Sequence, residues 1–295
     1  MEHVIVIGGS YAGMAAALQL VRARRRVAVI DAGERRNRFA SHSHGFLGQD
    51  GVDPAQLWVE AQRQLLAYPT LRWVDGVAGA VSGQRDAFRV SLHGGEALSA
   101  RRVLLATGVS DQLPEIPGLA ERWGRSVFHC PYCHGSELDR GRIGVIATGP
   151  MSLHQAQLLP DWGPVTFLTN QAVALEPEQH LNLQARGVTI EETAIARITG
   201  EADVELRDGR SLGFAGLFTA TRTTPASPIA EAAGCALVET PMGVQIRTTD
   251  SKETSVPGIF ACGDVARAPH SVSLAVGDGA WAGAQLHRSL VWPEG

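Results

Sequence analysis

The stretch VIVIGGSYAG, residues 4–13, runs from an apolar segment into a segment rich in alanine and leucine. Its first part, Val4 to Ile7, is a continuous β-branched run, as is typical of a strand buried on both faces. We predict a helix over residues 12–25 and a second buried strand over residues 27–30. Together these pieces form a βαβ unit, so the sequence indicates an α/β fold with a parallel sheet.

The turn between the first strand and the helix carries the residues of a dinucleotide-binding loop. Glycine is needed there because the turn is tight and the backbone must approach a pyrophosphate that rests on the helix N-terminus. Ser10 replaces the middle glycine, and its Cβ narrows that approach. Asp31 ends the second strand, where its carboxylate can accept hydrogen bonds from ribose hydroxyls. An ordinary strand-to-helix turn is the competing interpretation. The candidate cofactor-binding residues of this unit are Gly8, Gly9, Ser10, Ala12, Gly13 and Asp31.

The composition is that of a turn-rich α/β protein. Hydrophobic residues make up 44% of the 295 residues, charged residues make up 19%, and 33 residues are glycine. The net charge is −4, and we interpret the arginine-rich run at residues 22–26 as a solvated helix end rather than a nucleic-acid patch. No targeting leader is recognisable at Met1, and no apolar run approaches the roughly 20 residues of a membrane span. We therefore expect a cytoplasmic protein that binds neither nucleic acid nor membrane.

The later segments predict a smaller second domain and a return to the first. The proline-containing stretches at residues 113–118 and 221–228 have the composition of linkers. A buried strand over residues 258–261 has no partner sheet of its own, so we expect the last 50 residues to rejoin the first domain. Between the linkers we expect strands over 143–147 and 165–169, a helix over 152–159 and a hairpin over 194–213. The predicted domains are residues 1–113 with 245–295, which is discontinuous, and residues 118–242.

The motif HCPYCHG, residues 129–135, contains two cysteines three positions apart. At the start of a helix such a pair can close a small disulfide ring, and the helix N-terminus lowers the pKa of one thiol so that it can act as a nucleophile. We expect the flanking His129 and His134 to titrate near neutral pH, so either can take or return a thiol proton. The motif therefore predicts a redox-active dithiol formed by Cys130 and Cys133.

Three other interpretations of this motif fit the sequence less well. CPYCH also matches c-type haem attachment, which requires an exported chain and an axial-ligand fold. A structural zinc ion requires a second CxxC pair or histidines at ligand spacing, so we predict no metal site. An inert cysteine pair is the third interpretation. Cys235 and Cys262 stand alone in the sequence, and we expect them to fill buried positions.

Two further strings resemble the cofactor-facing segments of flavoproteins that have two dinucleotide-binding domains. They are LLATG, residues 104–108, and GIFACGDV, residues 258–265. The resemblance implies FAD as the cofactor of the first domain. It also implies that the carboxylate of Asp264 contacts the ribityl chain and that Gly263 gives the backbone room beside it. The further candidate cofactor-binding residues are Ala106, Thr107, Gly108, Gly263 and Asp264.

Almost the whole chain resembles the low-molecular-weight thioredoxin reductases, which have two Rossmann-like domains. By this resemblance Cys133 meets the flavin, Cys130 exchanges with the substrate, and His134, which stands where the reductases have an aspartate, is the acid/base. The form CPYCHG looks closer still to the dithiol oxidases that close the disulfides of gliotoxin and holomycin. The family further implies a homodimer, and a substrate that is a small-molecule or peptide dithiol or a thioredoxin-like protein.

An NADPH site in the smaller domain is doubtful. The second glycine-rich loop of the reductases corresponds to ATGPMS, residues 147–152, which lacks the first glycine and the final alanine of that loop. Where NADPH users of the family carry arginines for the 2′-phosphate, this chain has TNQA, residues 169–172. Such charge-assisted contacts are strong, so their loss weakens binding. A diverged site whose arginines come from elsewhere remains the alternative.

Three functions are consistent with these features. The first is an FAD-dependent dithiol oxidase, in which electrons run from a substrate dithiol through Cys130 and Cys133 to FAD and oxygen, with His134 deprotonating the incoming thiol. The second is a thioredoxin reductase-type enzyme fed by NADPH, or by a ferredoxin or flavodoxin. The third is a non-catalytic flavoprotein that senses redox state.

Two residue groups near these motifs have both a functional and a structural interpretation. The segment SHSHGFLG, residues 41–48, aligns with a loop that approaches the flavin in the reductases, so His42 and His44 either shape the active site or support the loop. Trp123, Phe128 and Tyr132 either form an apolar floor for a substrate or belong to the core.

Overall fold

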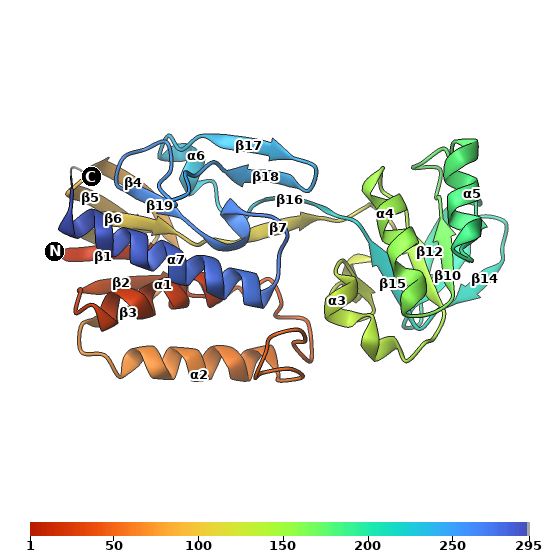
Figure 1. Ribbon diagram of the computed structural model, residues 1–295, viewed down its shortest axis with the longest axis horizontal. Coiled ribbons are helices and arrows are strands. Elements are labelled where there is room, and N and C mark those ends of the chain that lie inside the picture. Colours follow the sequence, from red (N-terminus) through yellow and green to blue (C-terminus); the bar gives the residue numbers. More distant parts are fainter. Residues whose placement is uncertain (294–295) are drawn as a thin grey trace.

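The computed structural model describes residues 1–293 as a larger and a smaller α/β unit, which lie end to end along the long axis of the molecule (Figure 1). The chain leaves the larger unit after β7 (Val109–Gln112) and enters the smaller one at β8 (Val127–Phe128). It returns between β15 (Gly216–Thr219) and β16 (Arg222–Pro225). Because β7 and β16 pair antiparallel, the two connections run side by side.

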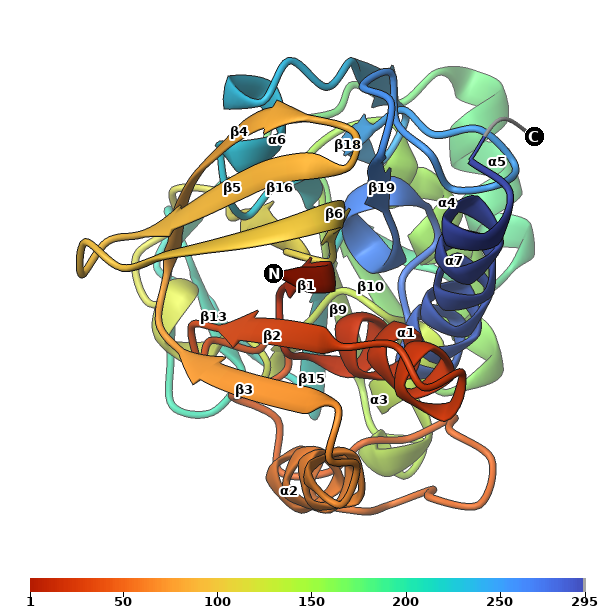
Figure 2. The ribbon, with the colours of Figure 1, turned by 90° about the vertical axis from the view of Figure 1, so that its left-hand side faces the viewer.

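The larger unit is built on a seven-stranded sheet with the order β3-β2-β1-β6-β5-β4, in which β19 also pairs with β6. The predicted βαβ unit is present, because β1 pairs parallel with β2 and with β6 (Figure 2). The elements of this sheet and its first helices are β1 (Glu2–Ile7), α1 (Tyr11–Arg22), β2 (Val27–Asp31), α2 (Pro54–Leu66), β3 (Leu71–Asp75), β4 (Ala78–Gln84), β5 (Ala87–Leu92), β6 (Ala97–Leu105) and β19 (Ile259–Ala261).

Helix α1 ends three residues before the predicted end at Arg25. Arg24 adopts a left-handed conformation with φ 59°, and the N–H of Arg25 donates to the carbonyl of Leu20. A left-handed residue that closes such a bond terminates a helix. The arginine run therefore begins in the last turn of the helix and continues into the following loop.

Both faces of the large sheet are covered. Successive side chains of the central strand β1 point to opposite faces, and apolar side chains on both faces must be buried. Val4 and Val6 of β1 pack with α1 and α7 (Val272–Val291), whereas Ile5 and Ile7 point to the opposite core. That second face is closed by α6 (Ile229–Ala232) and by a four-stranded sheet of the order β17-β18-β16-β7. Its remaining strands are β17 (Leu237–Thr240) and β18 (Gly243–Ile246).

The smaller unit repeats the α/β arrangement around a five-stranded sheet of the order β11-β10-β9-β15-β8. All four strand pairs of that sheet are parallel. The hairpin expected over residues 194–213 is a three-stranded antiparallel sheet. The elements are α3 (Pro131–His134), β9 (Ile143–Ile146), α4 (Met151–Leu158), β10 (Val165–Leu168), α5 (Pro177–Ala185), β11 (Thr189–Glu191), β12 (Ile195–Thr199), β13 (Asp203–Leu206) and β14 (Ser211–Gly213).

Residues 222–246 pack with the larger unit, although the sequence placed the end of the smaller domain at residue 242. Ile229 and Ala230 of α6 share a buried cluster with Phe88 and Val90 of β5. Their apolar side chains cover one face of the large sheet, so the chain has already crossed back at about Thr221. The larger unit is formed by two segments of the chain, one before and one after the smaller unit.

The close packing of α1 against α7 gives a direct test of the fold. A Cβ added to Gly279 would lie 2.1 Å from the carbonyl oxygen of Ala12, whereas one added to Gly277 would meet nothing within 4 Å. We expect Gly279→Ala to lower the free energy of unfolding by about 2 kcal/mol or more. The matched substitution Gly277→Ala should raise it by about 0.5–1 kcal/mol, because alanine is the better helix former. Urea unfolding of both variants measures this, and equal effects would contradict the packing of α7 on α1.

Candidate active site at the junction of the two units

The glycine-rich loop lies between β1 and α1, at the carboxyl end of the parallel strands of the large sheet. Gly8 has φ +112°, and a Cβ there would lie 2.2 Å from the carbonyl oxygen of Ala106, so only glycine fits. Ser10, the departure from the motif, has an ordinary φ of −96° and is the N-cap of α1, with no side-chain capping bond. Its position therefore does not require glycine, and its hydroxyl is not committed to the helix.

The three strings that the sequence singled out meet at this loop. The N–H of Ala106 donates to Ile7, and the N–H of Cys262 donates to Leu105. A Cβ on Gly263 would lie 2.6 Å from the Cβ of Ala12, which places the second string against the start of α1. The predicted residues all lie at the carboxyl ends of β1, β2, β6 and β19, either in the loops there, in the last residue of β2, in the first turn of α1 or in the 3-10 helix after β19; they are Gly8, Gly9, Ser10, Ala12, Gly13, Asp31, Ala106, Thr107, Gly108, Gly263 and Asp264.

Within residues 1–293, several buried oxygens have no hydrogen-bond partner, and two of them belong to predicted site residues at this edge. These two are Oγ1 of Thr107 and Oδ1 of Asp264. Buried polar atoms are normally satisfied, so unsatisfied ones at a loop cluster indicate that a ligand supplies the partner. A carboxylate oxygen accepts from hydroxyl groups, and a polyhydroxyl chain such as the ribityl chain of FAD offers them. The residues present therefore fit FAD.

Sequence reasoning missed Arg36, which lies in the loop after β2 and joins this edge to the start of the connection that leads to the smaller unit. Its Nε and Nη2 donate to the two carboxylate oxygens of Asp111 at 2.8 and 2.6 Å. Its Nη1 lies 3.2 Å from Oδ2 of Asp264 and 2.9 Å from Nδ1 of His270. Thr221 also donates to Asp111, at 2.8 Å. Arg36 stands among other arginines in the run ERRNR, so no local pattern marks it out.

The cysteine pair lies on the side of the smaller unit that faces the larger one. Cys130 and Cys133 form a disulfide with their Cα atoms 5.3 Å apart. Cys130 is the N-cap of α3, but α3 is a single turn of four residues. The helix-dipole argument for a lowered thiol pKa, made from the sequence, therefore carries little weight, since the dipole grows with aligned peptide units.

The two flanking histidines are neutral at physiological pH, which corrects the expectation that they titrate near pH 7. Burial lowers the pKa of His134 to about 4, assisted by the nearby His44. The imidazole of His134 stacks on Phe128, with ring centroids 4.2 Å apart. Burial and the positive charge of Arg36 likewise lower the pKa of His129 to about 4. The sequence could not show this because both shifts come from tertiary neighbours.

The loop that contains His42 and His44 reaches the segment just after the dithiol. Nδ1 of His44 lies 3.5 Å from a carboxylate oxygen of Glu137 and 3.6 Å from one of Asp50. His44 thus connects the two units beside the cysteine pair. His42 is exposed, and its ring centroid lies 6.3 Å from that of His44.

The aromatic residues near the dithiol do not form a common floor. Phe128 belongs to one buried cluster of the smaller unit, and Trp123 packs against another. Tyr132 is 72% exposed, and its ring meets Trp162 edge-on with centroids 5.4 Å apart. The core interpretation therefore holds for Phe128 and Trp123, and Trp162 is a neighbour that the sequence did not reveal.

In the smaller unit, polar groups in the loops after β9 and β10 form hydrogen bonds within the protein. These loops correspond to those with which the reductases bind a nucleotide. Oγ of the fully buried Ser152 accepts from the N–H of Thr148 at 2.9 Å. Oδ1 of Asn170 accepts from the N–H of Ile195 at 2.9 Å. The arginine that reaches this edge, Arg210, lies 2.7 Å from a carboxylate oxygen of Glu191 and the same distance from one of Asp208.

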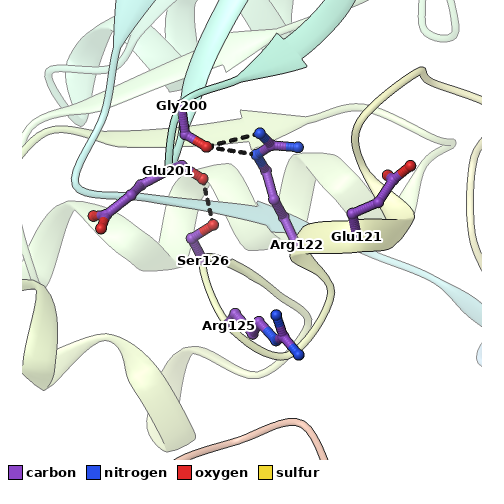
Figure 3. A pocket seen from close by; sticks show the side chains of 6 residues that line it. All are labelled: Glu121, Arg122, Arg125, Ser126, Gly200 and Glu201. Carbon is purple, nitrogen blue, oxygen red and sulfur yellow. Dashed lines mark hydrogen bonds between the residues drawn. The ribbon is translucent and has the colours of Figure 1, made fainter.

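A separate surface hollow in the smaller unit contains none of the predicted site residues. The guanidinium of Arg122 donates twice to the carbonyl of Gly200, and Ser126 donates to the carbonyl of Glu201 (Figure 3). The guanidinium of Arg122 and the hydroxyl of Ser126 are thus used within the protein. The lining residues are Glu121, Arg122, Arg125, Ser126, Gly200 and Glu201.

Across residues 1–293, none of the helices combines the length and the apolar character that crossing a bilayer requires.

Comparison with known proteins identifies the family of this fold and site. The family described as pyridine nucleotide-disulphide oxidoreductase matches residues 2–279. Thioredoxin reductase sirT of Leptosphaeria maculans is 32% identical, over 96% of this chain and 92% of that protein. The solved oxidoreductase from Agrobacterium tumefaciens is 57% identical with a TM-score of 0.97, over 99% of both chains. The crystal structure of HlmI is 37% identical with a TM-score of 0.91, over 98% of this chain and 92% of that one. The chain therefore belongs to the pyridine nucleotide-disulphide oxidoreductases, and it is an FAD-dependent disulfide oxidoreductase of the thioredoxin reductase type.

Proposed function

We propose that the protein is a dithiol oxidase, which closes a disulfide in a small-molecule or peptide dithiol and passes the electrons to oxygen. The observation that carries this proposal is the contrast between the two nucleotide edges. The edge of the larger unit has unsatisfied buried oxygens, at Thr107 and Asp264. At the corresponding edge of the smaller unit, Thr148, Ser152 and Asn170 form hydrogen bonds within the protein.

FAD would be held by the larger unit. The loop Gly8–Gly13 and the N-terminus of α1 would hold the pyrophosphate, because N–H groups and the helix dipole favour an anion there. Asp31 would hold the adenosine ribose, as in the βαβ nucleotide folds. The carboxylate of Asp264 would accept from the ribityl hydroxyls. Once bound, FAD supplies the two-electron acceptor that returns the reduced cysteine pair to its disulfide.

The chemistry at the cysteine pair balances without a nicotinamide. One substrate thiolate attacks the Cys130 sulfur, which breaks the Cys130–Cys133 bond and forms a mixed disulfide. The second substrate thiolate then attacks the substrate sulfur of this mixed disulfide. The bond to Cys130 breaks, the substrate leaves with its new disulfide, and both cysteines remain as thiols. Two electrons and two protons have left the substrate, and oxygen takes both as hydrogen peroxide when the cysteine disulfide forms again.

A neutral histidine beside the pair suits this direction of flow. The substrate arrives as thiols, so the first step needs a group that accepts a proton. With its pKa lowered to about 4, His134 is neutral at pH 7 and is a weak base, so it can accept a thiol proton only to pass it on and not to retain it. Its stacking on Phe128 fixes the ring plane, so the imidazole presents its nitrogens in a constant direction.

A thioredoxin reductase activity is the second candidate. It is favoured by the name of the relative sirT, which is described as a thioredoxin reductase. The ion pairs of Arg210 with Glu191 and Asp208 weigh against NADPH as its donor, because a 2′-phosphate would have to displace two carboxylates.

We expect the protein with bound FAD to form one hydrogen peroxide for each dithiothreitol oxidised in air, without consuming NADPH. Cys130→Ser and Cys133→Ser should each lower this rate by on the order of 100-fold or more, because each removes one of two sulfurs that act as a unit. Oxygen uptake and peroxide assays measure both quantities.

Cys235→Ser is the matched control, because Cys235 is buried and lies outside the disulfide. It should leave the rate unchanged. Peroxide formation that survives in Cys133→Ser would contradict the proposed route, and NADPH consumption without peroxide would favour the reductase.

The lowered pKa values of the two histidines also predict how stability depends on pH. His129 and His134 have folded-state pKa values of about 4, against about 6.5 in an unfolded chain. Between these values the unfolded state binds protons that the folded state does not, so stability should fall as the pH drops from 6.5 towards 4. Urea unfolding at several pH values should show this slope, and His134→Asn should reduce it. His93→Asn, at an exposed histidine of the larger unit, is the control, and an equal slope in both variants would refute the assignment.

A further inference from the structure

Lys252 is the only lysine in the chain, which otherwise uses arginine for its long cationic side chains. Its side chain is only 14% exposed, and its Nζ lies 2.6 Å from Oδ1 of Asp278. The side chain of Asp278 is 8% exposed. This ion pair is therefore buried inside the larger unit, where charges are held only at a cost in hydration.

The other carboxylate oxygen of Asp278 contacts the segment GIFACGDV, residues 258–265, which we call the flavin string. Oδ2 of Asp278 accepts from the N–H of Gly263 at 2.8 Å. Gly263 begins the short 3-10 helix Gly263–Ala266, and Asp264 is the next residue. The orientation of the Gly263 N–H fixes the peptide plane from which Asp264 projects, so Lys252, Asp278 and Asp264 are linked through one chain of contacts.

Stability alone does not explain this arrangement. Asp278 lies in α7 between two glycines, and neither aspartate nor glycine favours a helix interior. Lys252 has φ +66°, a left-handed conformation that side chains rarely adopt. Buried ion pairs of this kind are often no more stabilising than apolar residues of the same size. The buried ion pair and the left-handed backbone of Lys252 thus accompany a bond from Asp278 to a single backbone N–H, that of Gly263.

We propose that the Lys252–Asp278 pair is a positioning device for the flavin: it orients Gly263 so that the Asp264 carboxylate meets the ribityl chain. The proposal rests on the FAD site assigned above and does not depend on whether oxygen is the electron acceptor. Lys252 and Asp278 act through Gly263 and are positioning residues. Substitution of either residue should weaken the binding of FAD more than it lowers the stability of the apoprotein.

The test compares Lys252→Met with a neighbouring ion pair that does not reach Gly263. Arg85 lies 2.7 Å from Glu253, the residue next to Lys252, so Arg85→Met breaks a pair on the same turn. We expect Lys252→Met to raise the Kd of the apoprotein for FAD by about tenfold or more, as loss of a charge-assisted contact does. Arg85→Met should leave that Kd within about twofold of the unsubstituted protein.

Lys252→Arg retains the charge and should restore most of the affinity. Titration of the apoprotein with FAD, followed by flavin fluorescence, gives the Kd, and thermal unfolding of the same apoproteins separates a change of fold from a change of site. An unchanged Kd in Lys252→Met would overturn the proposal. Its failure is distinct from that of the oxidase proposal, which the peroxide assay decides.

Chemical labelling keeps the proposal testable even if Lys252→Met does not fold. Because Lys252 is the single lysine, acetylation with an N-hydroxysuccinimide ester modifies only this residue and the amino group of Met1, which serves as the reference. FAD should favour the form in which the ion pair is closed, so it should slow the acetylation of Lys252 several-fold. In Asp278→Asn this protection should disappear, which distinguishes the ion pair from simple coverage by FAD. Equal labelling of the unsubstituted apoprotein and holoprotein would refute the inference.

Discussion

The guanidinium of Arg36 joins three parts of the chain that are far apart in sequence. It donates two hydrogen bonds to Asp111 on β7, where the chain leaves the larger unit. Asp111 also accepts a hydrogen bond from Thr221, just before β16, where the chain returns. Its remaining nitrogen faces the carboxylate of Asp264. A planar donor with several fixed N–H groups can hold two carboxylates at once, which an ammonium group cannot do with the same geometry. The base of the two connections and the carboxylate of Asp264 are therefore held by the same group.

This constraint explains why the cysteine pair and the flavin edge face each other. His129, which precedes Cys130, lies close enough to Arg36 for its pKa to be lowered. Its ring centroid is 6.5 Å from that of His270. His44 connects the larger unit to Glu137, just after the pair. The dithiol is thus flanked by contacts with the larger unit on both sides, and burial keeps the imidazoles of His129 and His134 neutral at physiological pH by lowering their pKa values to about 4. The site has neutral histidines, and the loop groups of the smaller unit hydrogen-bond to one another. Both features favour a dithiol as the source of electrons.

The sequence predicted those parts that depend on short-range patterns. The β-branched run Val4–Ile7, the glycine loop and the CxxC spacing each have a local physical cause, and the α/β fold with two Rossmann-like units is confirmed. Features that depend on tertiary contact could not be predicted. Arg36 is one arginine among several, and its role comes from Asp111 and Asp264, which are distant in sequence. The early return of the chain near Thr221 follows from α6 covering the large sheet. The low pKa values of His129 and His134 follow from burial at the junction.

The direction of electron flow is the central claim, and single-turnover reduction of the bound flavin without oxygen tests it most directly. The oxidised protein is mixed anaerobically with a dithiol in one experiment and with NADPH in another, and the flavin absorbance is followed by stopped flow. The account predicts full bleaching by the dithiol and none by NADPH on the time scale of turnover. Bleaching by NADPH that is as fast as bleaching by the dithiol would contradict it.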